Sequence, residues 1–367
     1  MTISDKLFTP LRLGDIEVPN RILMAPLTRN RAQGDGTPKD MAQTYYLQRA
    51  SSGLIISEAT QISAMGKGYL DTPGIYTDQH VAAWRQITNA VHAAGGRIFC
   101  QLWHVGRISH TSLLPEGCSP VSSTDKAADS QTFTANGFEP TSKPEPLTVD
   151  GIKDTVRDYV KAAQCALAAG FDGIEVHAAN GYLLDQFLQD GVNDRDDEYG
   201  GSVENRMRFL LEVLAAVESV FPAGRTGVRL SPLGQANDMS DSDREATFGT
   251  IYETLSQRNL AYLHVVESFF TSESSDEDHA LLKRLRQRYS GNYLANGGYD
   301  GERASEALES GHATAVTIGR PFIANPDLPE RIRTGAPLNE QNQDTFYGGD
   351  EAGYTDYPFL ASNYPTT

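Results

Sequence analysis

The stretch Ile152-Lys-Asp-Thr-Val-Arg-Asp-Tyr-Val-Lys-Ala-Ala-Gln-Cys-Ala-Leu-Ala-Ala169 is followed by Gly170 and then by Gly173-Ile-Glu-Val-His177. The first part repeats its apolar residues with a period near 3.6, which predicts a helix, and Gly170 is typical of a helix C-cap. The second part is a short apolar run, which favours a strand buried on both faces, as in parallel sheets. A helix that leads into a buried strand is the repeating unit of an α/β fold.

The same alternation recurs along the whole chain. Further strands are expected at Arg21–Ala25, Leu54–Ser57, Arg97–Leu102, Thr226–Leu230, Tyr262–Val266, Asn292–Ala295 and Ala315–Ile318. Further helices are expected at Ala82–Ala94, Val203–Val220, Asp243–Gln257 and His279–Tyr289. Eight strands that alternate with helices predict a (β/α)8 TIM barrel of the α/β class, with residues 1–367 as a single domain. The rival is a doubly wound open sheet, but no GxGxxG motif opens a helix after the first strand.

The chain has 367 residues, which is roughly 100 more than a typical barrel needs. We expect the surplus in two places. Residues 104–150 are rich in Ser, Thr, Pro and Gly and follow the third strand, so we interpret them as a long excursion that caps the barrel. Residues 330–367 are polar and form an extended C-terminal segment. Long loops in compact domains are usually functional.

Composition excludes several classes of protein. The 31 Lys and Arg residues against 48 Asp and Glu residues give a net charge of −17, which argues against a nucleic-acid or anionic-membrane partner. The three cysteines form no close cluster, which argues against a disulfide framework and a zinc or iron–sulfur site. No signal-peptide pattern or membrane-length apolar run is present. We expect a cytoplasmic protein, monomeric or, as the alternative, dimeric.

In a TIM barrel the chemistry belongs at the C-terminal ends of the strands. The seventh and eighth predicted strands end in Gly297-Gly298 and Gly319-Arg320. Their backbone N–H groups, a helix N-terminus and the Arg320 guanidinium can together bind a phosphate. The alternative is that the glycines form only a tight turn and that Arg320 makes a surface salt bridge.

Two more strand ends carry polar side chains. His177, Asn180 and Tyr182 can converge on one small group, two of them holding an oxygen and the phenol giving a proton. The alternative is that His177 is a buried histidine whose hydrogen bonds go to the backbone and that Tyr182 packs in the core. Arg229 closes an apolar strand, where an unpaired charge costs several kcal/mol. A bound group with anionic character, or a pairing with Glu175 or Glu267, would relieve that cost. No metal is expected, because the histidines show no ligand spacing.

Taken together, these strand ends resemble the Old Yellow Enzyme family of flavin-dependent ene-reductases. The resemblance runs from about Leu7 to Leu360 and looks closest to the bacterial branch of pentaerythritol tetranitrate reductase and N-ethylmaleimide reductase. The phrases that carry it are Asn20-Arg-Ile-Leu-Met-Ala-Pro-Leu-Thr28, Gln101-Leu-Trp-His-Val-Gly-Arg-Ile-Ser-His110, His177-Ala-Ala-Asn-Gly-Tyr-Leu-Leu-Asp-Gln-Phe187, Asp197-Glu-Tyr-Gly-Gly-Ser-Val-Glu-Asn-Arg206, Gly319-Arg-Pro-Phe322 and the run Tyr354–Pro358.

The resemblance implies non-covalent FMN at the mouth of the barrel. The FMN phosphate would be bound by Gly297, Gly298, Gly319 and Arg320. The isoalloxazine would be held by Pro26, Leu27, Thr28, Ala59, Gln101 and Arg229. Within that set, Thr28 would hydrogen-bond the flavin O4, and Arg229 would face N1 and C2=O, where reduction places negative charge.

The resemblance also implies a ping-pong reaction. NADPH, with NADH as the alternative, gives a hydride to flavin N5, which passes it to the β-carbon of an activated alkene. Aldehydes, ketones and imides with an α,β double bond and nitroalkenes are the substrate class, with nitro compounds a further candidate. His177 and Asn180 would hold the substrate oxygen, and Tyr182 would protonate the α-carbon. Tyr69, Trp103 and Tyr354 would shape the substrate cavity, or else serve only as packing aromatics.

Two other functions compete with this one. A non-catalytic barrel that binds flavin or phenols would keep the cofactor site without turnover. A flavin-independent barrel lyase or aldolase would need a Schiff-base lysine, but the lysines near strand ends, such as Lys67, lie in expected loops. Some bacterial relatives carry histidine where Asn180 stands, so the resemblance leaves the preference for nitro esters open.

Overall fold

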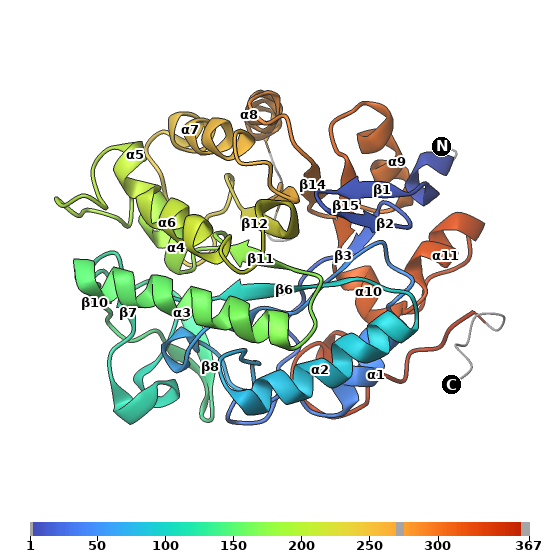
Figure 1. The fold of residues 1–367 in the computed structure, drawn as a ribbon, viewed down its shortest axis with the longest axis horizontal. Coiled ribbons are helices and arrows are strands. Elements are labelled where there is room, and N and C mark those ends of the chain that lie inside the picture. The colour runs from blue at the N-terminus through green and yellow to red at the C-terminus, as the bar shows by residue number, and fades with distance from the viewer. Residues whose placement is uncertain (1–2, 269–274, 361–367) are drawn as a thin grey trace.

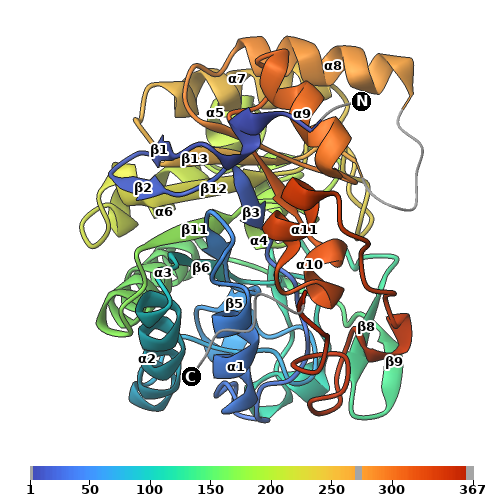
Figure 2. The ribbon, with the colours of Figure 1, turned by 90° about the vertical axis from the view of Figure 1, so that its right-hand side faces the viewer.

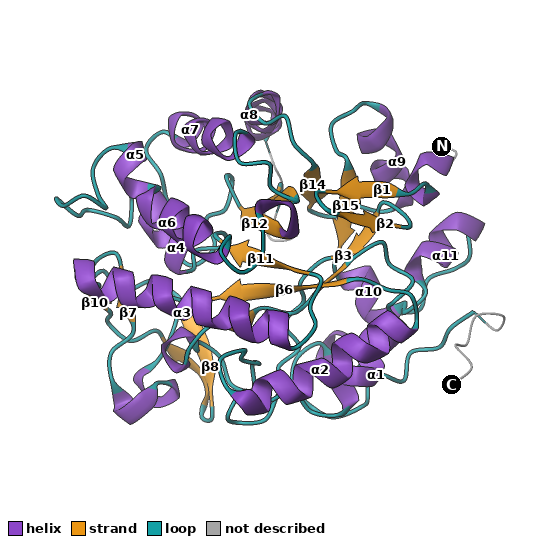
Figure 3. Ribbon diagram, viewed as in Figure 1, coloured by secondary structure: helices purple, strands orange, loops and turns teal. Residues whose placement is uncertain are grey.

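Eight parallel strands form a closed barrel in the computed structural model, which describes residues 3–268 and 275–360 (Figures 1 and 3). Each strand pairs with the next one around the barrel, and the eighth pairs with the first. The expected (β/α)8 barrel is confirmed. In order around the barrel, the strands are β3 (Ile22–Met24), β4 (Ile55–Ile56), β6 (Ile98–Trp103), β11 (Gly173–His177), β12 (Thr226–Leu230), β13 (Tyr262–Val266), β14 (Tyr293–Asn296) and β15 (Ala315–Ile318).

Helices surround the strands on the outside of the barrel (Figure 3). Helix α3 shows why they form: the Thr148 side chain accepts from Gly151 N at its start, and a face that includes Ile152, Tyr159 and Ala166 is buried. The helices are α1 (Met41–Gln48), α2 (Asp78–Ala93), α3 (Val149–Ala168), α4 (Leu183–Leu188), α5 (Val203–Arg206), α6 (Arg208–Val217), α7 (Arg244–Ser256), α8 (Asp276–Gln287), α9 (Gly301–Glu309), α10 (Arg320–Ala324) and α11 (Leu328–Thr334).

One expected helix is divided in two. The pattern over Val203–Val220 predicted a single helix, but the backbone at Met207 has φ −82° and ψ −7°, which separates α5 from α6. The buried Arg206 side chain donates to Leu188 O and Gly201 O, and these bonds hold α5 against the end of α4. Sequence periodicity did not show this break, because the apolar positions continue across it.

The N-terminal end of the barrel is closed by a hairpin, β1 (Leu11–Leu13) and β2 (Ile16–Val18). Its buried side chains form an apolar cluster with residues from the starts of the barrel strands, including Leu23, Phe99 and Tyr262. A second hairpin, β8 (Gln131–Thr134) and β9 (Gly137–Pro140), lies far from the first in both views (Figures 1 and 2). The two ends of the barrel are therefore covered by different segments of the chain.

The segment that follows β6 contains regular structure. Besides β8 and β9, it holds two short strands that pair with each other in parallel, β7 (Val121–Ser122) and β10 (Glu145–Pro146). The Ser122 and Ser123 hydroxyls donate to the side chain and the backbone of Gln186 in α4. The excursion is thus bonded to the helix that begins at the C-terminal end of β11.

The C-terminal segment is held to the body of the protein by buried arginines. Helix α11 ends at Thr334 and is capped by Gly335, which has a left-handed φ of +65°. Beyond it, Arg29 donates to the carbonyls of Phe346 and Gly353, and Arg31 donates to that of Asp350. Over residues 3–268 and 275–360, no helix is both long and apolar enough to cross a membrane.

Candidate active site

A tight turn at the end of β11 places His177, Asn180 and Tyr182 together. Asn180 has φ +60° and Gly181 has φ +77°, and a Cβ at Gly181 would lie 2.7 Å from the Ala236 carbonyl oxygen. Asn180 N donates to Ser231 Oγ at 2.8 Å, and Gly181 N donates to Asp185 Oδ2 at 2.8 Å. The turn is therefore fixed from both sides, and glycine is required at its tightest point.

The protonation state of His177 follows from one contact. Its Nδ1 faces Ala179 N–H at 3.3 Å and must accept from it, so the ring proton of the neutral form is on Nε2. Burial, followed by the electrostatic effects of Arg229 and His264, holds the pKa of His177 well below its usual value. His177 is therefore a neutral ring near pH 7 that offers an N–H donor.

Asn180 and Tyr182 supply the other two polar groups. Among the described residues, Asn180 Oδ1 is buried without a hydrogen-bond partner. The Nδ2 group of the same carboxamide is the donor that a ligand oxygen would need. The Tyr182 ring lies 5.2 Å from the His177 ring, edge to face, and its hydroxyl is 3.3 Å from that of Tyr69. Burial raises the pKa of Tyr182, although Tyr69, Asn237 and Arg229 oppose the rise, so the phenol keeps its proton at neutral pH.

Three of the predicted aromatics form one wall. Trp103 stacks on Tyr69 at 5.9 Å between ring centroids and meets Tyr182 edge to face at 5.1 Å. Its indole Nε1 is buried and has no partner among the described residues. The structure thus brings Tyr69 and Trp103 beside the His177–Tyr182 turn, as the sequence predicted for a substrate cavity, although their contact with a substrate stays a prediction.

Gln101 and Arg229 lie in the barrel interior, on β6 and β12. Gln101 Nε2 donates to Glu175 Oε1 at 2.7 Å. Arg229 Nη2 donates to Asn296 Oδ1 at 3.0 Å, and its buried Nε has no partner among the described residues. Glu175 is the carboxylate that favours the charged form of Arg229, while Glu267 contacts tyrosines and a histidine instead.

The predicted phosphate-binding residues follow β14 and β15. Gly297 has φ +138° and Gly298 has φ +66°, and a Cβ at Gly297 would come within 2.6 Å of Ser268 Oγ. Arg303 donates to Gly298 O at 2.6 Å, which stabilises the turn. Gly319 precedes α10, whose first residue is Arg320. Pro26, Leu27, Thr28 and Ala59 lie just beyond the ends of β3 and β4, at the same end of the barrel.

The C-terminal tyrosines differ from the prediction in their placement. The Tyr354 ring is 1% exposed and stacks on Tyr45 at 4.2 Å, with the Arg29 and Arg31 guanidinium groups over it. Tyr347 is 69% exposed, and its phenol is among the groups that raise the pKa values of Tyr69 and Tyr182. This placement favours Tyr347 over Tyr354 as the aromatic that the C-terminal segment gives to the cavity. No local signal distinguished them, because both are tyrosines in one polar tail.

Asn237 is a second residue that sequence reasoning missed. It has φ +61°, donates from Nδ2 to Asn180 O at 2.8 Å and accepts from Ser130 Oγ at 3.0 Å. It therefore connects the turn after β11 to the excursion beside β8. Its position in an irregular loop after β12 gave no sequence signal.

Comparison with known proteins agrees with this geometry. The sequence profile of the NADH:flavin oxidoreductase / NADH oxidase family matches residues 6–339. The structure aligns with morphinone reductase at a TM-score of 0.93 and 49% identity, covering 98% of both chains. The chain belongs to the Old Yellow Enzyme family. An Old Yellow Enzyme homologue from Zymomonas mobilis aligns at a TM-score of 0.93 and 44% identity, over 96% of this chain and 99% of the other.

Plant members of the family are similar over the full length. Putative 12-oxophytodienoate reductase 11 of Oryza sativa subsp. japonica is 45% identical over 99% of this chain and 100% of its own. 12-Oxophytodienoate reductase 2 of Arabidopsis thaliana is 43% identical over 97% and 96%. The protein is therefore an oxidoreductase of the Old Yellow Enzyme type, and its family implies FMN as the cofactor.

The residues present fit an FMN group. Arg229 Nε is a buried donor without a partner among the described residues, at the strand ends where the pyrimidine edge is expected. Gly297 and Gly298 both have positive φ values, which permit a backbone turn that a phosphate can approach closely. An unpaired donor at one side and a glycine turn with positive φ at the other fit a flavin ring with a phosphate tail.

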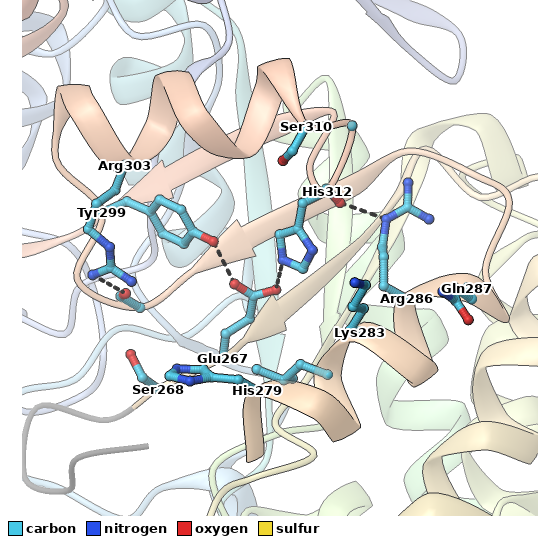
Figure 4. Close-up of a pocket in the computed structure, with 13 residues that line it drawn as sticks. Glu267, Ser268, His279, Lys283, Arg286, Gln287, Tyr299, Arg303, Ser310 and His312 are labelled. Atoms are coloured by element: carbon cyan, nitrogen blue, oxygen red, sulfur yellow. Dashed lines mark hydrogen bonds and ion pairs between the residues drawn. The ribbon is translucent and has the colours of Figure 1, made fainter. Parts of the chain in front are cut away.

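A separate cavity of about 550 Å³ lies on the outer side of the barrel, against α8 and α9 (Figure 4). At its centre Glu267 accepts from the Tyr299 hydroxyl at 2.7 Å and contacts His312 Nε2 at 2.6 Å. Of the predicted site residues, Gly297 is the one that lines it. Because His177, Asn180 and Tyr182 are not among the residues that line it, this cavity is distinct from the His177–Tyr182 site.

Proposed function

We propose that this protein is an FMN-dependent ene-reductase that oxidises NADPH, with NADH as the alternative, and reduces activated alkenes. The proposed substrates are α,β-unsaturated aldehydes, ketones and imides and nitroalkenes, with nitro compounds as a further class. The single observation that carries this proposal is that one turn holds the His177 Nε2–H donor, the Asn180 carboxamide and the protonated Tyr182 phenol. The relatives' names denote reductases of 12-oxophytodienoate and morphinone, both ketones, which supports this substrate class.

His177 and Asn180 bind the carbonyl or nitro oxygen. Because His177 is neutral with its proton on Nε2, it donates a hydrogen bond without transferring the proton. Two donors on one oxygen withdraw electron density from the conjugated double bond and make its β-carbon electrophilic. The turn that carries both residues is fixed by Ser231 and Asp185, so the donors are already oriented before substrate binds.

Tyr182 donates the proton that the α-carbon receives. Its hydroxyl lies beside that of Tyr69, which can hydrogen-bond the phenolate left after transfer. When bound, FMN supplies the hydride acceptor and donor between the nicotinamide coenzyme and the alkene. Trp103 and Tyr69 limit the cavity on one side, and their stacked rings offer an apolar surface to a planar substrate.

The cofactor-binding set remains as the sequence suggested. We assign the isoalloxazine to Pro26, Leu27, Thr28, Ala59, Gln101 and Arg229, and the phosphate to Gly297, Gly298, Gly319 and Arg320. A positive charge at Arg229 stabilises the negative charge that reduction places on the pyrimidine edge. Three more features stay predictions: one FMN-binding domain over residues 1–367, a capping role for residues 104–150, and a cytoplasmic monomer. Size-exclusion chromatography distinguishes the monomer from a dimer.

An anaerobic visible spectrum tests the whole proposal. The purified protein, supplied with FMN, should bleach near the flavin band when NADPH is added and recover when 2-cyclohexenone follows. The same titration with NADH, compared as kcat/KM, distinguishes the coenzymes; a solved complex of morphinone reductase with tetrahydroNAD supports a nicotinamide site in this family. A flavin band without this cycle would indicate a non-catalytic flavin- or phenol-binding barrel.

Replacing Tyr182 with Phe tests the proton donor. We expect Tyr182→Phe to slow the oxidative half-reaction by about 100-fold or more, within the range for general acid catalysis, while NADPH still reduces the flavin at nearly the wild-type rate. Tyr159→Phe is the matched control, because Tyr159 is a buried tyrosine in α3 whose hydroxyl bonds no described residue. Stopped-flow traces in which both half-reactions of Tyr182→Phe slow equally would contradict this role.

Replacing His177 with Ala tests the oxygen-binding pair. Loss of one hydrogen bond to a bound phenolate costs about 1.5–3 kcal/mol, so the Kd for a phenol should rise at least tenfold. The long-wavelength absorbance that phenols induce on flavin gives this Kd directly. An unchanged phenol titration would exclude His177 from the oxygen site.

A further inference from the structure

A chain of buried polar side chains crosses the barrel interior below the proposed flavin site. Glu175 on β11, His264 on β13 and Thr317 on β15 are each no more than 1% exposed. Glu175 pairs in register with Gln101, and His264 pairs in register with Arg229. The chain therefore lies directly against the two residues that are proposed to hold the flavin pyrimidine edge.

The Glu175 carboxylate determines the direction of two hydrogen bonds in this chain, and the neutral form of His264 determines the third. The Glu175 carboxylate can only accept, so it receives N–H from Gln101 Nε2 at 2.7 Å and from His264 Nδ1 at 2.9 Å. In neutral His264 the remaining nitrogen, Nε2, then accepts from the Thr317 hydroxyl at 2.8 Å. Because Gln101 must direct an N–H toward Glu175, its carboxamide cannot rotate end for end without leaving that carboxylate facing an oxygen.

The charges in this layer are also defined. Burial alone raises the pKa of Glu175, but His264, Arg229 and Gln101 outweigh it, so the net pKa is below its usual value and the group is ionised. Burial and Arg229 lower the pKa of His264 despite the Glu175 carboxylate. The interior therefore holds one negative charge at Glu175 and one positive charge at Arg229, which donates to Asn296 and forms no direct ion pair with Glu175.

We propose that Glu175 is a positioning residue for the flavin: it orients the Gln101 carboxamide and partly offsets the Arg229 charge at the pyrimidine edge, thereby setting the reduction potential. This inference rests on the proposed function, because it concerns the same cofactor site. Reduction adds negative charge near Arg229, so the Glu175 carboxylate opposes reduction while Arg229 favours it.

The potential of the bound flavin tests this inference. Glu175→Gln keeps the side-chain volume and removes the charge, so the flavin should become easier to reduce. We expect the reduction equilibrium to shift about tenfold toward the reduced form, which for a two-electron couple is about 30 mV upward. Anaerobic dye equilibration measures this shift on the holoprotein.

The affinity for FMN tests the orientation of Gln101. The neutral carboxamide that Glu175→Gln introduces can donate to Gln101 as well as accept from it, so the Gln101 carboxamide is no longer fixed and the FMN Kd should rise by severalfold. Gln101→Leu and the double variant Gln101→Leu/Glu175→Gln complete a cycle, and the two losses should be non-additive if Glu175 acts through Gln101. Flavin fluorescence on release gives the Kd.

Glu267→Gln is the matched control. Glu267 is also a buried carboxylate, 7% exposed, but it bonds Tyr293, Tyr299 and His312 away from the barrel interior. The Glu267→Gln variant should therefore leave the flavin reduction potential unchanged. If Glu175→Gln fails to fold, Glu175→Asp is the second variant. It keeps the negative charge but moves the carboxylate away from Gln101, so it should weaken FMN binding while the flavin reduction potential stays near the wild-type value.

A wild-type potential and FMN Kd in Glu175→Gln, or an unchanged FMN Kd in Glu175→Asp, would overturn the inference. These readouts need no turnover, so they are separate from the proposed function. A protein that binds FMN but never reduces an enone would contradict the proposed function alone, and the shift in Glu175→Gln would still support the role of Glu175.

Discussion

The buried Asp185 carboxyl makes a quantitative prediction about stability and pH. It lies in α4 with no exposed surface, and it accepts from Gly181 N and from Gln189 Nε2, both at 2.8 Å. Burial raises its pKa from the usual 3.8 to about 7, against the hydrogen bonds that lower it. The folded protein therefore binds this proton more tightly than the unfolded chain does.

The sign and size follow from that difference. Because the folded pKa is the higher one, the stabilisation is complete below about pH 3.8 and is lost as the pH rises through about 7. The full loss is about 4 kcal/mol, at 1.36 kcal/mol per pH unit. Roughly half of this stabilisation is already lost at pH 5.5, so the free energy of unfolding falls by about another 2 kcal/mol between pH 5.5 and 8.5.

Asp185→Asn removes this titration and keeps the shape of the side chain. Its amide oxygen can still accept from Gly181 N, and Gln189 can rotate its carboxamide to match the new N–H. An unfolding entropy of about 2.1 cal/mol/K per residue gives roughly 0.8 kcal/mol/K for 367 residues. The difference in Tm between the variant and the wild type should therefore grow by about 3 °C between pH 5.5 and 8.5, in favour of the variant.

Thermal unfolding of the FMN-saturated proteins across this pH range is the assay. Asp150→Asn is the control for the chemical substitution itself, because the Asp150 side chain is 91% exposed in α3. A constant difference between Asp185→Asn and the wild type would show that the carboxyl does not titrate in this window, and the reasoning from its burial would be refuted.

Two further predictions concern the cofactor and the cavity. Gly297→Ala should raise the FMN Kd at least tenfold by fluorescence titration, because its Cβ would lie 2.6 Å from Ser268 Oγ; Gly311→Ala, with no heavy atom within 4 Å, should leave the Kd unchanged. Tyr347→Ala should weaken phenol binding severalfold without changing the Tm. Tyr354→Ala removes a buried ring, so it should lower the free energy of unfolding by about 3–5 kcal/mol and the Tm by about 5 °C. Equal effects of the two tyrosine variants on phenol binding would contradict the assignment of the cavity aromatic to Tyr347.

The strands were predictable from sequence because their signal is local. Gly173–His177, Thr226–Leu230, Tyr262–Val266 and Ala315–Ile318 were predicted with the bounds that the structure has. The other four barrel strands differ from the prediction by one residue at each end. A strand buried on both faces needs an apolar residue at nearly every position, so the pattern is unmistakable in a single sequence. The short helices α1, α4, α9, α10 and α11 lacked enough turns to show a period.

The site was predictable only in part. His177, Asn180 and Tyr182 lie on one turn of consecutive sequence, so their meeting needed no long-range contact. Tyr347 and Asn237 lie in irregular segments, and their positions depend on where the C-terminal tail and the loop after β12 pack. Such segments are placed by a few side-chain bonds from distant residues, for example those from Arg29 and Arg31, which no local pattern encodes.

The sequence by itself determined the barrel, the strand ends and the identity of the residues that stand there, because hydrophobic periodicity and turn chemistry act over a few residues. The tertiary structure alone decided which of these residues are partners. The Gln101–Glu175–His264–Thr317 chain joins four strands, and its protonation states follow from burial that arises only when the barrel closes. Burial raises the free energy of a charge unless a partner offsets it, so the closed barrel determines which groups are ionised and which are neutral.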